Sequence, residues 1–146
     1  IMPLIEGIPI VCHPDPTDVL GIARAVARYR ATILFGTATF LRLFARNKKV
    51  DPILLEPLRV VVAGAEKLPA QVRQEFQLKF SKPIYEGYGQ TETTLQIATF
   101  KFMEPKPGSL GKPTPGWDLV LLDEDRSVPV LVFGRGALRY DRAPDG

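Results

Sequence analysis

The chain has 146 residues, of which 45% are hydrophobic and 24% are charged, with a formal net charge of +3. This is the composition of an ordinary globular protein with enough chain for one hydrophobic core. Basic residues are interspersed with acidic ones, which argues against nucleic-acid binding, and no stretch approaches the ~20 apolar residues of a membrane span.

The single cysteine and the single histidine, Cys12 and His13, are adjacent. One thiol cannot form an internal disulfide, and two neighbouring ligands make a poor metal site. No signal peptide is visible, so we expect a reducing, cytoplasmic compartment. The chain opens in mid-pattern at Ile1, which suggests an internal fragment of a longer protein, and we expect membrane association only through another domain of that parent.

The first predicted elements are a strand and a helix. Residues 8–12 form a short apolar run with β-branched side chains, which is typical of a buried strand. A helix is predicted from about Asp18 to Arg30, with Asp15 or Thr17 as its N-cap. Its apolar stripe at three-to-four spacing comprises Val19, Ile22, Ala23 and Val26.

Further along, strands and helices alternate. Residues 32–35 are predicted as a strand that ends at Gly36, and Thr37 as the cap of a helix containing Phe40, Leu41, Leu43 and Phe44. Residues 51–57 are predicted to contain one helical turn. Residues 58–63 form a nearly continuous apolar run, which indicates a strand buried on both faces, as in a parallel sheet covered by helices.

Pro69 suits the first turn of the next helix, in which apolar residues recur every four positions at Val72, Phe76 and Phe80. A short strand follows at residues 84–85. This alternation predicts an α/β fold, a doubly wound and mostly parallel sheet with crossover helices, over residues 1–105. Residues 106–146 are predicted to form a Pro/Gly-rich linker and the start of a small β-subdomain, with strands at 117–122 and 128–133.

Two predicted strands end in loops rich in glycine and polar residues, at 64–66 and 87–92. Ligands bind at the carboxyl ends of strands in such sheets, so both loops are predicted to face one crevice. The glycines allow close backbone approach, and Tyr88 offers a ring for a purine. Thr91 offers donors to a phosphate and Glu92 a carboxylate for Mg²⁺. A tight turn followed by a helix capped by Thr91 is the alternative.

Residues Tyr88-Gly89-Gln90-Thr91-Glu92 resemble the adenine-and-phosphate motif of the adenylate-forming superfamily, which includes acyl-CoA synthetases, luciferases and peptide-synthetase adenylation domains. Residues 62–68 resemble its adenine-side loop, and residues 106–113 resemble the segment that leads to its β-subdomain. Residues 1–90 are most similar to the acyl-ACP synthetase part of bifunctional acylglycerophosphoethanolamine acyltransferases, whereas residues 85–125 are closer to medium-chain acyl-CoA synthetases.

The resemblance implies a role for each residue of the two loops. Tyr88 would stack on adenine, Thr91 would contact the α-phosphate, and Glu92 would help to hold Mg²⁺, which makes Thr91 and Glu92 the candidate catalytic residues. The residues implied to bind the nucleotide are Gly64, Ala65 and Glu66 on the adenine side, Glu86 and Gly87 beside the base, and Tyr88, Gly89, Gln90 and Thr91 in the motif. Gly87 and Gly89 would also border the acyl group.

The implied reaction has two steps. A carboxylate, most simply a fatty acid, attacks the α-phosphorus of ATP to give acyl-AMP and pyrophosphate, and the thiol of CoA or of an acyl-carrier-protein phosphopantetheine then displaces AMP. The acyl chain and the choice of acceptor stay open.

The sequence departs from the superfamily in three places. Its phosphate loop with a lysine, its hinge and its C-terminal lysine are absent from the 146 residues, and residues 127–146 match poorly. We therefore expect weak or no adenylation by this chain. The alternative hypothesis is a non-catalytic nucleotide- or partner-binding module on a degenerate adenylation fold, and flanking sequence would discriminate the two.

Overall fold

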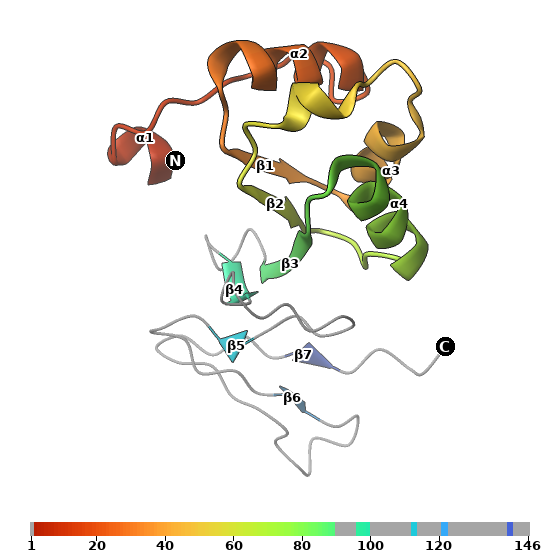
Figure 1. Ribbon diagram of the computed structural model, residues 1–146. Coiled ribbons are helices and arrows are strands. Elements are labelled where there is room, and N and C mark those ends of the chain that lie inside the picture. Colours follow the sequence, from red (N-terminus) through yellow and green to blue (C-terminus); the bar gives the residue numbers. More distant parts are fainter. Residues whose placement is uncertain (1, 90–95, 100–111, 114–120, 123–139, 142–146) are drawn as a thin grey trace.

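A computed structural model describes residues 2–89, 96–99, 112–113, 121–122 and 140–141. Its main sheet has the strand order β1-β2-β3-β4-β5, formed by β1 (Ile33–Gly36), β2 (Val60–Ala63), β3 (Ile84–Gly89), β4 (Gln96–Thr99) and β5 (Lys112–Pro113). The helices are α1 (Met2–Ile5), α2 (Val19–Tyr29), α3 (Ala38–Arg46), the 3₁₀ turn η1 (Pro52–Leu55) and α4 (Ala70–Phe80) (Figure 1). Among the described helices, none has both the length and the apolar character needed to cross a membrane.

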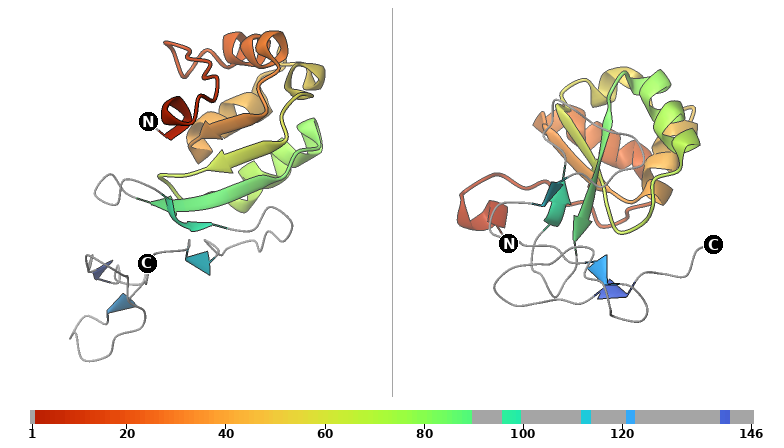
Figure 2. Two further views of the ribbon diagram at one scale, coloured as in Figure 1. Left: turned by 90° about the vertical axis from the view of Figure 1, so that its left-hand side faces the viewer. Right: turned by 90° about the horizontal axis from the view of Figure 1, so that it is seen from below.

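The first three strands are parallel, because β1 pairs with β2 and β2 pairs with β3 in that sense. α3 and η1 connect the first pair, and α4 connects the second. Both connections step in the same direction across the sheet, so right-handed crossovers place α3 and α4 on the same face. The two helices contact each other there (Figures 1 and 2). The predicted α/β fold with parallel strands and crossover helices is confirmed.

The hydrophobic core lies between this sheet face and the helices. Leu41 on α3, Phe76 on α4 and Val61 on β2 are fully buried, and the rings of Phe76 and Phe80 are 4.7 Å apart. Burial of β2 is complete on one face only, because successive strand residues point to opposite faces and the described helices cover one of them. On the other face of β1, Ile33 and Phe35 are exposed.

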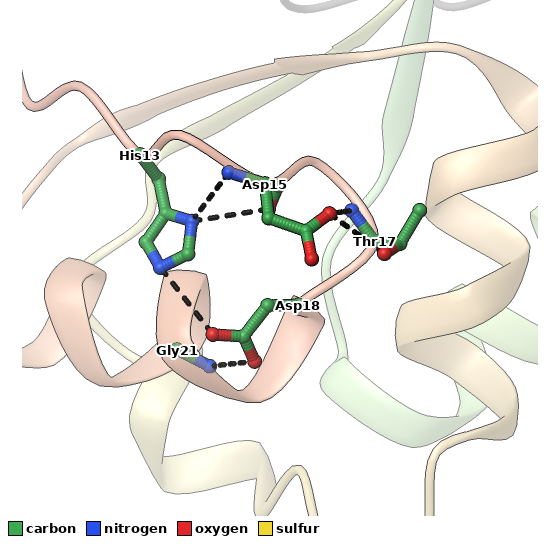
Figure 3. A network of polar contacts seen from close by, with 5 residues as sticks. All are labelled: His13, Asp15, Thr17, Asp18 and Gly21. Atoms are coloured by element: carbon green, nitrogen blue, oxygen red, sulfur yellow. Dashed lines mark hydrogen bonds and ion pairs between the residues drawn. The ribbon is translucent and has the colours of Figure 1, made fainter.

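Helix α2 begins at Val19, one residue after its predicted start near Asp18, and its N-cap differs from both predicted caps. Asp18 is the N-cap, and its carboxylate accepts the N–H of Gly21 at 2.9 Å. Asp15 cannot serve because its carboxylate accepts the N–H and the hydroxyl of Thr17, which forms an Asx turn ahead of the helix (Figure 3). The Nε2 atom of His13 lies 3.4 Å from the Asp18 carboxylate, so the loop that precedes α2 contacts the N-cap residue. The predicted caps, Asp15 and Thr17, were therefore wrong.

Residues 8–12 do not form the predicted strand. Ile8, Ile10 and Val11 are 50%, 46% and 41% exposed, and the segment has no regular secondary structure. A buried strand needs a neighbouring strand to receive its backbone hydrogen bonds, and none of the described strands pairs with this segment. Apolar, β-branched composition indicates that a segment can form a strand, but it does not indicate whether a partner is present.

Strand β3 is longer than predicted and contains Tyr88 and Gly89, which the sequence placed in the loop at 87–92. Its second half pairs with the antiparallel β4, and the register shifts between Tyr88 and Gly89. A separate small sheet joins β6 (Leu121–Leu122) to β7 (Tyr140–Asp141) in parallel. The predicted strand at 117–122 is thus described only at its end, and the predicted strand at 128–133 lies outside the described residues.

Candidate functional site

The carboxyl ends of the three parallel strands meet at one edge of the sheet. Ala63 at the end of β2 is the register partner of Glu86 on β3 and of Gly36 on β1. Immediately beyond, the N–H of Gly64 donates to the carbonyl of Gly36 at 3.1 Å. A Cβ placed on Gly64 would lie 3.6 Å from the carbonyl oxygen of Gly87. The two loops that the sequence predicted to share a crevice are therefore adjacent.

Ala65 has a left-handed backbone conformation, with a φ of 68°. A side chain with a Cβ adopts this conformation at a cost of about 1–3 kcal/mol. Such a conformation persists only where the surroundings hold it, and it is typical of sites that bind a ligand closely. The turn it produces directs the chain away from β2 and across the end of the sheet toward α4.

The Glu66 side chain is bonded to the start of α3. Its carboxylate accepts the backbone N–H of Thr39 at 2.6 Å and the Thr39 hydroxyl at 3.2 Å. The hydroxyl of Thr37, followed by these two Thr39 donors, holds the pKa of the Glu66 carboxyl below its ordinary value, and the nearby Arg42 acts in the same direction. Glu66 therefore lies in the predicted adenine-side loop, and its carboxylate contacts α3.

The Glu86 side chain is buried beneath the same loop. It forms an ion pair with Arg73 of α4 and accepts the backbone N–H of Leu68 at 3.3 Å. Arg73 also donates to the carbonyl of Ile84 at 2.7 Å. The Glu86 carboxylate thus joins α4, β3 and the far end of the loop. Both Glu86 carboxylate oxygens are therefore engaged, one by Arg73 and one by the Leu68 N–H.

Tyr88 lies two residues beyond Glu86 on β3, so strand alternation places both on one sheet face. It is the register partner of Ala98 on β4, and the irregularity in the ladder follows it directly. Bulges of this kind occur next to ligand sites, where they redirect a side chain or end the pairing. Tyr88 is half-buried and Gly89 is exposed, so the strand emerges at the surface beside the loop at 64–66.

The predicted site residues fall into two groups. Those brought together at the sheet edge are Gly64, Ala65, Glu66, Glu86, Gly87, Tyr88 and Gly89. Gln90, Thr91 and Glu92 lie outside the described residues, so the predicted catalytic pair and metal ligand lie there too. The two described acids at this edge do not form a Mg²⁺ site, because Glu66 is bonded to Thr39 and Glu86 to Arg73.

Two residues that hold the loop were missed by sequence reasoning. The sequence singled out Gly36 as a strand end and Thr37 as a helix cap, both of which are confirmed, but it did not single out Thr39. Nothing in its local sequence indicates a bond to Glu66. Arg73 could have been found, because an acid within the apolar run of β3 requires a buried cation. The Arg73 position on α4, beside the apolar stripe, supplies that cation.

This arrangement is suited to a flat, uncharged group. Both carboxylates at the edge have cationic or hydrogen-bonding partners, so neither presents an unpaired negative charge. The backbone of Gly64 lies against that of Gly87, one residue before the half-buried Tyr88. A purine base uses these two features, peptide groups for its polar edge and a ring face for stacking.

Comparisons with known proteins bear on the family of the chain. Residues 1–139 match the model of a family described as AMP-binding enzyme. The chain is 32% identical over 130 residues to human mitochondrial acyl-coenzyme A synthetase ACSM3, covering 86% of this chain. It is 43% identical over 76 residues to 4-hydroxybutyrate–CoA ligase 1 of Metallosphaera sedula, covering 52% of this chain.

The crystal structure of the anthranilate CoA ligase AuaEII with anthranoyl-AMP superposes with a TM-score of 0.75 at 26% identity, over 82% of this chain and 23% of that one. The chain spans 22% of the length of the human relative and 14% of that of the archaeal one. The family model and the human relative each cover most of the sequence. The chain belongs to the family of AMP-binding enzymes, and its relatives are acyl–CoA ligases.

Proposed function

We propose that this chain forms the adenine-facing surface of an AMP-forming acid–CoA ligase. The observation that carries the proposal is the contact between the loop at 64–66 and the end of β3, where Gly64 lies against Gly87 one residue before Tyr88. In that arrangement the backbone of Gly64 and Ala65 borders the base, and the Tyr88 ring covers it. Gln90 and Thr91 would continue along the phosphates.

The proposed reaction proceeds through an acyl-adenylate. A carboxylate oxygen forms a bond to the α-phosphorus of ATP while the bond to pyrophosphate breaks. The thiol sulfur of CoA then bonds to the acyl carbon, and AMP leaves. Mg²⁺ would neutralise phosphate charge during the first step, and Glu92 is the residue of this chain proposed to hold it. The described residues act by holding and orienting the base.

We propose an aliphatic acid as the substrate and CoA as the acceptor. The relatives named for acyl and 4-hydroxybutyrate groups are 32% and 43% identical to this chain, whereas the anthranilate ligase is 26% identical. All three of these proteins are named as CoA ligases or synthetases, which favours CoA over a carrier protein. A fatty acid agrees with the human relative and with the resemblance to medium-chain synthetases.

A nuclear magnetic resonance titration of the 146-residue chain tests this function. AMP is expected to shift the amide signals of residues 64–66 and 86–89, and GMP to shift them less, because the site is proposed to recognise adenine. In AMP-saturated protein, octanoate is expected to receive more saturation transfer than benzoate. Equal responses to AMP and GMP would contradict the nucleotide assignment, and stronger transfer to benzoate would contradict the aliphatic acid.

The 146-residue chain is expected to show little acid-dependent ATP–pyrophosphate exchange. Groups that stabilise transferring phosphoryl oxygens each contribute several kcal/mol in such enzymes, and the described residues at the sheet edge include none of that kind aimed at a phosphate. Rapid exchange by this chain with octanoate would contradict the expectation.

A further inference from the structure

The loop from Gly64 to Leu68 is held near both ends by hydrogen bonds to carboxylates. Near its start, Glu66 accepts the N–H and the hydroxyl of Thr39 on α3. At its end, the N–H of Leu68 donates to Glu86 of β3. The hydrogen bond between Leu68 and Glu86 is buried and is part of the core beside α4. The hydrogen bonds between Glu66 and Thr39 are at the surface, because Glu66 is exposed. They therefore hold the loop without being part of the core.

The hydrogen bonds between Glu66 and Thr39 restrict the backbone of Ala65. Ala65 is left-handed, and it stands between the Gly64 N–H, bonded to Gly36, and the Glu66 carboxylate, bonded to Thr39. With only the Gly64 bond, Ala65 could relax to an ordinary backbone conformation, and the loop would move relative to the end of β3. With both bonds, the peptide groups at 64–65 are held between β1 and α3.

We propose that Glu66 is a positioning residue for the adenine base, which fixes the peptide groups of Gly64 and Ala65 by binding α3 through Thr39. The inference rests on the proposed function, because it needs a nucleotide base at this loop. It assigns to Glu66 a role different from lining the base, since the carboxylate is already bonded to the two Thr39 donors. The base would be recognised by the backbone that Glu66 holds in place.

A comparison of two ligands separates positioning of the base from other effects. AMP and ribose 5-phosphate share the sugar and the phosphate, and only AMP carries the base. Removing the negative charge of Glu66 changes the affinity for both phosphates alike, so the ratio of the two dissociation constants isolates the base. Glu75 is the matched control, because it is a partly exposed glutamate on α4 whose carboxylate bonds Arg46 and Gln71, away from the loop.

The expected result for Glu66→Ala is a loss of about tenfold in the preference for AMP over ribose 5-phosphate, the effect of losing hydrogen bonds to a charged acceptor. Glu75→Ala is expected to leave the preference within about twofold of the wild type, as for surface changes away from a site. Glu66→Gln keeps an oxygen for the Thr39 N–H and is expected to retain most of the preference.

The outcomes distinguish this inference from the proposed function. If the wild-type chain binds AMP no better than ribose 5-phosphate, the proposed function fails and the inference fails with it. If the wild type prefers AMP and Glu66→Ala keeps that preference, or loses affinity for both ligands equally, only the inference fails. Hydrogen exchange at the Thr39 amide is expected to be faster in Glu66→Ala and unchanged in Glu75→Ala, and unchanged exchange in both variants would also overturn it.

Discussion

Replacing Arg73 by methionine is expected to lower the free energy of unfolding by about 3–5 kcal/mol, because removal of one partner leaves a buried charge without compensation. The side chains of Arg73 and Glu86 are only 16% and 9% exposed. Methionine matches the length of the arginine stem but cannot pair with the carboxylate or donate to the Ile84 carbonyl. Urea denaturation followed by circular dichroism measures the loss.

The double variant Arg73→Met/Glu86→Gln is the control for this experiment. Glutamine removes the buried charge and keeps an acceptor for the Leu68 N–H, so the double variant is expected to be more stable than Arg73→Met alone. Equal stability of the single and double variants would show that the loss comes from packing of the arginine stem, and the assignment of Glu86 as a buried ionised partner would be wrong.

The second large effect is expected at Tyr88. Stacking of a base on an aromatic ring contributes about 1–3 kcal/mol, so Tyr88→Ala is expected to weaken AMP binding by roughly 5- to 150-fold. Tyr88→Phe keeps the ring and is expected to bind AMP within about threefold of the wild type by the same reasoning. Isothermal titration calorimetry with AMP gives the three dissociation constants.

Tyr29 supplies a control for that series. It is 59% exposed at the end of α2 and contacts the guanidinium of Arg28, so Tyr29→Ala removes the same side chain at a different place. Tyr29→Ala is expected to leave AMP affinity unchanged. If Tyr88→Phe bound AMP as weakly as Tyr88→Ala, the hydroxyl rather than the ring would be the recognition group, and stacking would have to be abandoned.

The sequence predicted those features that depend on local chemistry. Thr37 caps α3 because a hydroxyl at that point can accept the free N–H of Phe40, and the apolar spacing of Val72, Phe76 and Phe80 directs one face of α4 into the core. The adjacency of the loops at 64–66 and 87–89 followed from parallel strand order, because the carboxyl ends of parallel neighbours meet at one sheet edge.

The features that were not predicted depend on partners distant in the chain. Thr39 and Glu66 are 27 residues apart, and no local pattern gives the direction of a glutamate side chain. The left-handed Ala65 carries a methyl group where glycine would be expected. Residues 8–12 have the composition of a strand, but pairing decides the structure. Tyr88 was placed in the loop at 87–92 because glycines flank it, but it pairs with Ala98 of β4 and is part of strand β3.

The central claim is that the loop after β2 and the end of β3 form one surface for adenine. Intermolecular nuclear Overhauser effects between AMP and the 146-residue chain measure this directly. We expect the adenine H2 and H8 protons to show contacts both to the Ala65 methyl group and to the Tyr88 ring protons. Adenine contacts confined to another surface, such as the depression lined by Gln74, Gln77 and Leu78 on α4, would contradict the claim.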